Sequence, residues 1–499
     1  MRKTVVFIIC FCAFIQFSNA QLGLNKEKFT HADTLRGSLN PNRTWWDVLR
    51  YDIDVKPDYE SKTIIGKTTI SFKSSGDGNK TMQIDLQHPL IIDSIIYHNG
   101  KIEFKKIDSN AYNAFLKSVE SKTYIDKIEG GKGVTDNENQ ITIYYHGTPR
   151  EAIRPPWDGG WIWKKDAEGR PWMSVACQGL GASVWYPCKD HQSDEPDNGA
   201  SLTIIVPDTL VAVGNGRLKS TIKNNDGTTT YTWEVKDPIN NYNIIPYIGK
   251  YVNWSDTFQG EKGKLDLNYW VLDYNLDKAK KEFEQVKPML RCFEHWFGPY
   301  PFYEDGYKLV ESPHLGMEHQ SAVAYGNGYQ NGYRGMDLSG SGWGLKWDFI
   351  IVHESAHEWF GNNITSKDLA DMWVHEGFAN YSETLYTECL FGKEAGNEYN
   401  YGTRKRIQND RTIIGPYGVN KEGSGDMYYK GGNMIHTIRQ VINNDGKFRN
   451  ILRGLNKTFY HQTVTYNDIT GYISKEAGID LSTVFDQYLR TATLPVLHI

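Results

Sequence analysis

Apolar and polar residues alternate in short runs over the first half of the chain, from about Asp47 to Tyr251. A period of two places alternate side chains on opposite faces of a strand, so these runs predict β-strands. Gly, Asn, Asp and Pro residues separate the runs and are typical of turns. Clear examples are residues 51–55, 68–72 and 140–145. The pattern predicts antiparallel sheets arranged as a sandwich or saddle.

The pattern changes near Val252, after which apolar residues recur with helical spacing. The predicted helices cover residues 276–297, 346–360, 372–390 and 429–443. The remainder to about Arg490 is predicted to be mainly helical, and residues 493–497 to begin a strand. A chain of 499 residues exceeds one ordinary core. We therefore expect a multidomain α+β protein, with a β domain over residues 21–250 before a mainly α domain over residues 251–499.

The first 20 residues are typical of a signal peptide. Arg2 and Lys3 precede an apolar stretch of 14 residues, and small residues then lead to Ala20. A membrane anchor is the alternative, but a spanning helix needs about 20 apolar residues. We therefore expect cleavage before Gln21 and export to the periplasm or the medium. No later segment is apolar enough to span, so the mature chain should lack an integral membrane segment.

Charge and cysteine content narrow the function classes. The formal net charge is −5, and removal of the two basic residues at the start makes it −7. This acidity argues against nucleic acid as a partner. Four cysteines follow the predicted cleavage point, namely Cys177, Cys188, Cys292 and Cys389. They are too few for a disulfide scaffold, and a Cys177–Cys188 bridge stays open at this stage.

The segment from His353 to His357 has the sequence His-Glu-Ser-Ala-His. On a helix, residues four apart share one face, so the two imidazoles can bind one zinc ion. Glu354 lies between them and can take a proton from the attacking water. Two ordinary helix histidines are the alternative interpretation. The sequence therefore predicts a metal centre with Glu354 as its general base.

A catalytic zinc site needs a third protein ligand and an open position. Glu376 follows His357 after eighteen residues and lies on the next predicted helix. His375 competes for the same role, but a helix turns about 100° per residue, so only one of the pair can face the metal well. A surface glutamate is the remaining alternative. We predict that Glu376 is the third ligand.

Residues 352–383 resemble the aminopeptidase N family of zinc peptidases, which includes leukotriene hydrolase-type enzymes. The resemblance extends to Phe-Gly-Pro-Tyr-Pro at 297–301, to Gly-Met-Glu-His at 316–319, and to Trp-Tyr-Pro-Cys-Lys-Asp at 185–190. It spans roughly residues 45–497. The resemblance implies a thermolysin-like catalytic domain in the second half and one zinc ion per chain.

The resemblance also implies individual roles. The implied zinc ligands are His353, His357 and Glu376, with Glu354 as the base. The residues implied to contact substrate are Gln178, Gly316, Met317 and Glu318. Of these, Glu318 binds the free amino group and Gln178 assists it. Tyr428 stabilises the oxyanion, and its neighbour Tyr429 is the alternative. A carboxylate is the natural partner of an ammonium group, and a phenol donor suits a developing oxyanion.

The sequence departs from the family pattern at two places. Leu315 replaces a glycine and His319 replaces an asparagine in the segment that lines the substrate site. Family members usually continue into a further domain, whereas this sequence ends at Ile499. It therefore resembles a short exported form, with an incomplete chain as the alternative. One expectation is therefore a substrate site that is more open to solvent and selects peptides by length differently from other family members.

These observations predict a zinc-dependent aminopeptidase acting on peptides with a free amino terminus. One alternative is a zinc hydrolase of another substrate, either an endopeptidase or an epoxide hydrolase. A non-catalytic peptide-binding relative is the other. Glu318 argues against an endopeptidase, because an enzyme that cleaves internal peptide bonds does not need to bind the terminal amine of its substrate.

Overall fold

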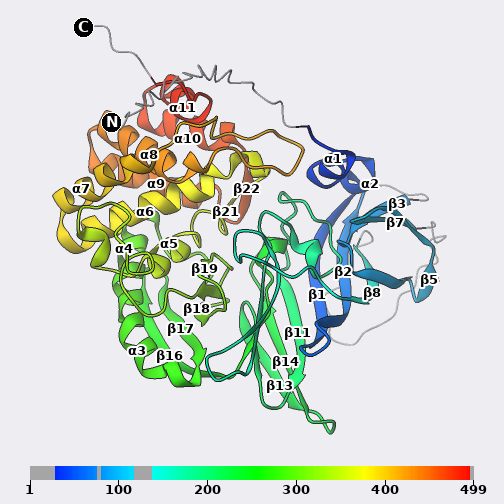
Figure 1. Ribbon diagram of the computed structural model, residues 1–499. Helices are drawn as coiled ribbons and strands as arrows, with labels where there is room; N and C mark the ends of the chain where they lie inside the picture. The colour runs from blue at the N-terminus through cyan, green and yellow to red at the C-terminus, as the bar shows by residue number, and fades with distance from the viewer. Residues whose placement is uncertain (1–27, 76–79, 117–137, 495–499) are drawn as a thin grey trace, which may run out of the picture.

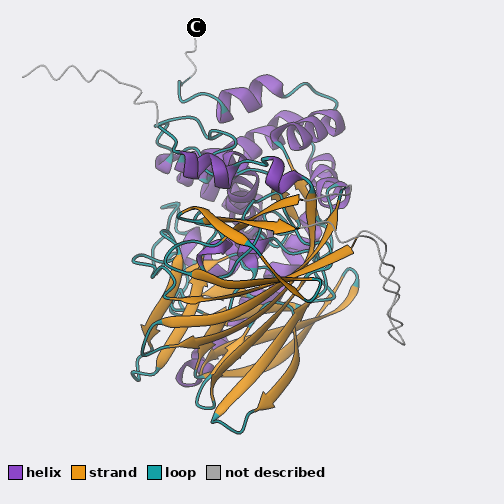
Figure 2. Cartoon of the chain, turned by 90° about the vertical axis from the view of Figure 1, so that its right-hand side faces the viewer, coloured by secondary structure: helices purple, strands orange, loops and turns teal. Residues whose placement is uncertain are grey.

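The structure is a computed structural model that describes residues 28–75, 80–116 and 138–494. Figure 1 shows a strand-rich first half beside a second half whose helices lie above a sheet. In Figure 2, which is turned by 90°, most helices lie at the top and most strands lie below them. The predicted signal peptide lies outside the described residues. So does most of the segment 493–497, which was predicted to begin a strand. The predicted fold class, a β-rich half followed by a mainly helical half, is confirmed.

Among the described residues, three sheets build the first half. An eight-stranded sheet has the order β13-β14-β11-β1-β2-β8-β4-β5, a four-stranded sheet the order β12-β15-β10-β9, and a three-stranded sheet the order β3-β7-β6. The strands are β1 (Trp46–Asp58), β2 (Thr63–Ser74), β3 (Lys80–Asp85), β4 (Ile91–Tyr97), β5 (Gly100–Ile102), β6 (Phe104–Asp108), β7 (Ala111–Leu116), β8 (Glu138–Gly147), β9 (Gly160–Lys165), β10 (Pro171–Ala176), β11 (Ala200–Pro207), β12 (Val211–Val213), β13 (Arg217–Lys223), β14 (Thr228–Val235) and β15 (Tyr247–Gly249). Pairing in these sheets is antiparallel as predicted, except that β1 and β11 run parallel.

The second half begins with a mixed five-stranded sheet that the helical prediction from Val252 onward missed. Its order is β16-β17-β18-β20-β19. The strands are β16 (Tyr251–Gly260), β17 (Gly263–Leu272), β18 (Tyr307–Glu311), β19 (Gly316–Met317) and β20 (Val323–Tyr325). The first two alternate buried and exposed residues, so the period of two continues past Val252. A further parallel pair joins β21 (Ile364–Ser366) to β22 (Gln462–Val464).

The described residues also form eleven α-helices, two before the first sheet and nine in the second half. They are α1 (His31–Gly37), α2 (Pro41–Thr44), α3 (Leu276–Glu282), α4 (Val286–Phe297), α5 (Phe349–Ala356), α6 (Trp373–Phe391), α7 (Lys393–Thr403), α8 (Tyr429–Ile442), α9 (Asp445–Thr458), α10 (Tyr466–Ala477) and α11 (Ser482–Leu489). The single helix predicted over 276–297 is wrong, because a 3₁₀ turn at Phe283–Gln285 divides it. Pro288 lacks the N–H that an unbroken helix would need to bond the carbonyl of Glu284.

The described residues form two hydrophobic cores. One gathers residues from Trp46 to Tyr251 with a few from the second half, and the other runs from Phe258 to Leu489. The boundaries proposed at residues 20/21 and 250/251 stay predictions. Within the described ranges, no helix combines the length and apolar character needed to cross a bilayer.

The disulfide bond differs from the pair left open by the sequence. Cys292 on α4 is bonded to Cys389 on α6, across 97 residues of chain. Cys177 and Cys188 are free, buried thiols instead. The bridge joins two helices of the core that surrounds the metal centre, so it supports the helix that carries Glu376.

Candidate metal centre and active site

Helix α5 and the first turn of α6 bring three ligand groups together. Asp348 caps α5 by accepting hydrogen bonds from the N–H groups of Ile350 and Ile351. His353 lies in the last turn of that helix, and His357 is the residue that caps its end. Glu376 is in the first turn of α6. All three predicted ligands are buried and offer atoms to one shared point.

The distances within this cluster fit a metal ion. The Nε2 atoms of His353 and His357 each lie 3.4 Å from Oε2 of Glu376. Two atoms held about 2.0–2.1 Å from a tetrahedral ion lie about 3.3–3.4 Å apart. The same Oε2 atom is buried without a hydrogen-bond partner. A cation bound here would therefore satisfy a polar atom that otherwise has no partner.

Neighbouring acceptors set the tautomer of both histidines. His353 Nδ1 lies 2.8 Å from Oε1 of Glu383, and His357 Nδ1 lies 2.9 Å from the carbonyl oxygen of Phe360. A carboxylate and a carbonyl can only accept, so both Nδ1 atoms carry the hydrogen. Each Nε2 lone pair is then directed at the metal position. Glu383 was not predicted from the sequence, although it lies seven residues after Glu376 on the same helical face.

The cluster favours a positive charge at its centre, which a bound metal ion supplies in place of protons on the two imidazoles. Burial opposes protonation of His357, but the carboxylate of Glu376 raises its pKa to about 9. Burial would raise the pKa of Glu376, yet the two imidazoles hold it well below its ordinary value. Burial raises the pKa of Glu354 to about 7, although His353 and His357 lower it. A carboxylate poised near neutrality suits a general base.

His375, the competing ligand, faces elsewhere. Its Nε2 accepts a hydrogen bond of 2.9 Å from the N–H of Ser366, and the ring is fully buried. Burial lowers its pKa to about 3, so the ring is neutral. The helical rotation of about 100° between neighbours explains why Glu376 and His375 point to different surroundings.

Glu318 lies beside the cluster in a buried setting. It is 2% exposed. One oxygen of its carboxylate, one of the Glu354 carboxylate and one ring nitrogen of His357 all lie within 4.8 Å of one another. The Oε1 atom of Glu318 accepts hydrogen bonds from Gln178 Nε2 and from the hydroxyl of Tyr242, the latter at 3.1 Å. Both donors belong to the first half of the chain. Tyr242 carried no signal in the sequence, because only the packing of the two halves brings it here.

The strand β19 lies against the predicted base. A Cβ atom at Gly316 would lie 2.8 Å from Oε1 of Glu354, so a larger residue there would displace the base or the strand. Met317 is buried on the same strand. This strand is the edge of its sheet and pairs only with β20. Among the described residues its other edge has no strand partner, and an unpaired sheet edge can bind an extended peptide.

The two adjacent tyrosines occupy different surroundings. The ring of Tyr428 stacks near that of His353, with centroids 6.0 Å apart. Burial raises the pKa of Tyr428 well above its ordinary value, so the phenol keeps its proton. The guanidinium of Arg406 instead lies over the ring of Tyr429. Its Cζ atom is 5.8 Å from the centroid of that ring. The geometry favours Tyr428 as the residue that faces the metal centre.

Comparisons with known proteins agree with this geometry. The family described as Peptidase M1 N-terminal domain matches residues 48–242, and the Peptidase family M1 domain matches residues 282–488. The chain belongs to peptidase family M1. Aminopeptidase N of Lactococcus lactis subsp. lactis is 28% identical over 476 residues, which cover 90% of this chain and 51% of the relative. Aminopeptidase N of Lactobacillus helveticus is 23% identical over 482 residues, with the same coverage of 90% and 51%.

This M1 peptidase spans about half the length of the curated relatives it matches. Its fold resembles the whole of a shorter solved structure, the M1 zinc metallopeptidase from Deinococcus radiodurans. That likeness has a TM-score of 0.73 at 20% identity and covers 91% of this chain and 96% of the other. A variant of the Deinococcus radiodurans protein, with a TM-score of 0.71, is bound to a Tyr-Ser-Ala substrate.

The M1 assignment and the geometry together identify the metal. His353, His357 and Glu376 form the zinc site of this chain, and Glu354 is its candidate base. Two imidazoles and one carboxylate are a donor set of catalytic zinc sites that leave one position open. The predicted ligands, the predicted cofactor and the family resemblance are thus confirmed.

Proposed function

We propose that this M1 peptidase is a zinc aminopeptidase, which removes amino-terminal residues from peptides. The observation that carries the proposal is the buried carboxylate of Glu318 beside the zinc ligands. A desolvated carboxylate needs a positively charged partner, and the free ammonium group of a peptide supplies one. Binding the terminus at Glu318 places the first peptide bond, rather than an internal bond, next to the zinc site.

Each nearby residue has a role in this proposal. Gln178 donates to Glu318 through its nitrogen and presents its amide oxygen to the ammonium group. The edge strand at Gly316 and Met317 aligns the substrate backbone. Burial raises the pKa of Glu318, and a bound ammonium group restores its charge.

The catalytic step uses Glu354 and Tyr428. Zinc, when bound, polarises the scissile carbonyl and lowers the pKa of water. Glu354 takes the proton from the attacking water and delivers it to the leaving amine. Tyr428 donates a hydrogen bond from its phenol to the developing oxyanion, where such a donor contributes most in the transition state.

The test uses the chain from Gln21 with its zinc content measured. A panel of aminoacyl chromogenic amides is supplied both free and amino-terminally acetylated. We expect about one zinc per chain and cleavage of the free amides alone, with Glu354→Gln as the inactive control. Equal cleavage of acetylated substrates would overturn the proposal in favour of an endopeptidase. Zinc binding without any cleavage would favour a peptide-binding relative.

We further propose that the protein is exported to the periplasm or the medium. Two features support this: the amino-terminal pattern around Arg2, Lys3 and Ala20, and the Cys292–Cys389 bond, which is typical of oxidising compartments. Cell fractionation with amino-terminal sequencing tests it. We expect a chain that starts at Gln21 outside the cytoplasm, and an uncleaved cytoplasmic chain would refute export.

A further inference from the structure

Three distant segments meet at the carbonyl group of Gly179, the residue after Gln178. Arg36 on α1 donates to this oxygen from Nη2 at 3.2 Å. Asn420, from the loop between α7 and α8, donates to the same oxygen from Nδ2 at 3.3 Å. One donor thus comes from the start of the described chain and the other from the catalytic half. Both act on the peptide unit that joins residues 179 and 180, one unit beyond Gln178, whose side chain contacts Glu318.

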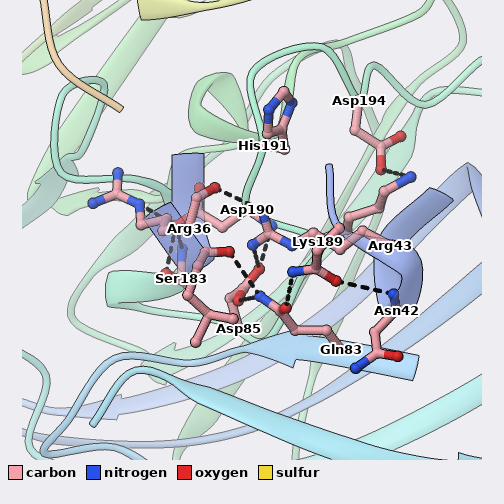
Figure 3. Close-up of polar contacts among 12 residues, drawn as sticks. Arg36, Asn42, Arg43, Gln83, Asp85, Ser183, Lys189, Asp190, His191 and Asp194 are labelled. Carbon is pink, nitrogen blue, oxygen red and sulfur yellow. Dashed lines mark hydrogen bonds and ion pairs between the residues drawn. The ribbon is translucent and has the colours of Figure 1, made fainter. Parts of the chain in front are cut away.

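Arg36 also forms an ion pair with a buried carboxylate. Its Nε lies 3.3 Å from Oδ2 of Asp190, and the hydroxyl of Ser183 donates to the same oxygen at 2.5 Å (Figure 3). Asp190 is 4% exposed. The loop backbone also passes close to the guanidinium, because a Cβ at Gly181 would lie 2.5 Å from Arg36 Nη2. Only glycine allows this approach, and its φ of 97° is also one that other residues rarely adopt.

Helix α1 is anchored on both sides. The buried guanidinium of Arg43 donates to the carbonyl oxygens of Arg36 and Ser38 at 2.6 and 3.2 Å, and it pairs with Asp85 on β3 (Figure 3). On the other side, Gly37 contacts the catalytic half. A Cβ there would lie 2.3 Å from the backbone nitrogen of Asn420. The helix is therefore fixed between the first half of the chain and the loop that precedes Tyr428.

We propose that Arg36 and Asn420 are positioning residues for amine recognition. They fix the carbonyl of Gly179 and so hold Gln178 against Glu318. Gln178 is only partly buried and lies in the turn after β10, which a hydrogen bond from the N–H of Gly181 to the carbonyl of Cys177 closes. Arg36 and Asn420 hold the Gly179 carbonyl of this turn from two other segments. The inference rests on the aminopeptidase function proposed above. It assigns α1 a part in substrate binding that neither the motifs nor the zinc site indicate.

The test is a double-mutant cycle in the zinc-loaded chain. The single variants are Arg36→Ala, Asn420→Ala and Gln178→Ala. Two double variants combine Gln178→Ala with Arg36→Ala or with Asn420→Ala. Arg50→Ala is the matched control, because Arg50 also pairs with a carboxylate, at 2.9 Å, and donates to a loop carbonyl at 2.8 Å. The side chains of Arg36 and Arg50 are 19% and 22% exposed. Measurements are kcat and KM on free aminoacyl amides, with thermal unfolding recorded for every variant.

We expect Arg36→Ala and Asn420→Ala each to raise KM about five- to tenfold while kcat changes less than about twofold. In the Gln178→Ala background the same substitutions should change kcat/KM by less than about twofold, because they act through that side chain. Arg50→Ala should leave both constants unchanged.

Additive effects in the cycle would overturn the inference, since they would show a general structural role. So would Arg36→Ala and Asn420→Ala variants that bind substrate like the parent. Failure of the proposed function is separate, because the parent chain itself would then cleave none of the free amides. Should Arg36→Ala not fold, the Asn420→Ala half of the cycle decides alone, by the same criteria.

Discussion

At the scale of single residues, the chemistry depends on which atoms carry protons. Glu383 and the carbonyl of Phe360 fix the hydrogens of His353 and His357 on Nδ1, away from the metal position. Glu354 has a pKa of about 7 and lies on the same helix. Zinc binding and proton transfer are thereby assigned to different side chains. A substitution can therefore remove one of these two functions and leave the other.

Glu354→Gln should retain zinc and lose turnover. The amide has nearly the same shape, but it cannot take a proton, and general-base catalysis contributes about 10²–10⁴ in rate. The check is kcat on a free aminoacyl amide together with metal content after gel filtration. Loss of zinc in this variant would contradict the assignment of Glu354 as base rather than ligand. Activity within tenfold of the parent would also contradict it.

Tyr428→Phe should lower kcat about 10²–10³-fold with little change in KM, because its phenol acts on charge that develops in the transition state. Tyr429→Phe is the matched control, since the neighbouring ring lies against Arg406 instead. Steady-state kinetics on both variants separates the roles. Should the second substitution abolish kcat and the first leave it intact, the oxyanion donor would be Tyr429.

Glu383→Gln should weaken zinc binding about tenfold, since it removes the negative charge that orients and polarises His353. The carboxylate also accepts from Tyr399 at 2.6 Å, so the isosteric amide preserves most of the packing. Competition with a chromogenic chelator measures the affinity. Glu398→Gln, on α7 and bonded to Trp343, serves as the control that should bind zinc like the parent. Equal affinities in all three proteins would show that Glu383 has only a packing role.

At the scale of elements, local patterns identified the parts of the site that lie on one helix. His353 and His357 follow from i,i+4 spacing, and α6 and α8 begin and end within about a residue of the prediction. Glu318 and Gln178 were predicted only from the family resemblance, because both lie in loops that follow strands, and loops have no diagnostic period. Tyr242 and Arg36 were missed, since their roles depend on tertiary packing. The Cys292–Cys389 pair was missed for the same reason, as its cysteines lie 97 residues apart.

That disulfide should contribute to the stability of the helical half. It closes a loop of 97 residues between α4 and α6, and removing such a constraint typically costs about 2–4 kcal/mol. We expect the Cys292→Ser, Cys389→Ser double variant to unfold at lower denaturant concentration. Reduction of the parent chain should produce the same shift and provides the control. An unchanged midpoint in both experiments would show that the bond does not stabilise the fold.

At the scale of the whole molecule, the active site is shared between the two halves. The zinc ligands and Glu318 come from the second half, whereas Gln178 and Tyr242 come from the first. Hydrogen bonds across the boundary include Asn243 to Asn362 at 2.8 Å. Asn362 in turn donates to the carbonyl of Glu318 at 2.8 Å. In the function proposed above, amine recognition depends on how the halves dock, which makes the stability of their interface relevant to substrate binding.

Two carboxylates meet at another part of that interface. Asp305 of the second half accepts hydrogen bonds from the backbone N–H groups of Lys236 and Asp237 in the first half, at 2.8 and 3.1 Å. Burial and the nearby Asp305 raise the pKa of Asp237 from 3.8 to about 7. The folded protein therefore keeps a proton that the unfolded chain releases near pH 4. Between those two pKa values, stability falls as pH rises.

Asp237→Asn should remove this part of the pH dependence. We expect the variant and the parent to unfold at similar temperatures near pH 4, with the variant more stable by a margin that grows to pH 7 and then levels off. Because the side chain of Asp237 is only partly buried, solvent screening limits the gain to about 1–2 kcal/mol. Thermal unfolding at half-unit pH steps measures the difference, and Asp277→Asn, on the exposed face of α3, is the control. A difference in stability between variant and parent that stays constant from pH 4 to 8 would contradict this prediction. It would show that Asp237 is ionised in the folded state throughout this range, and a cation would then have to compensate its charge next to Asp305.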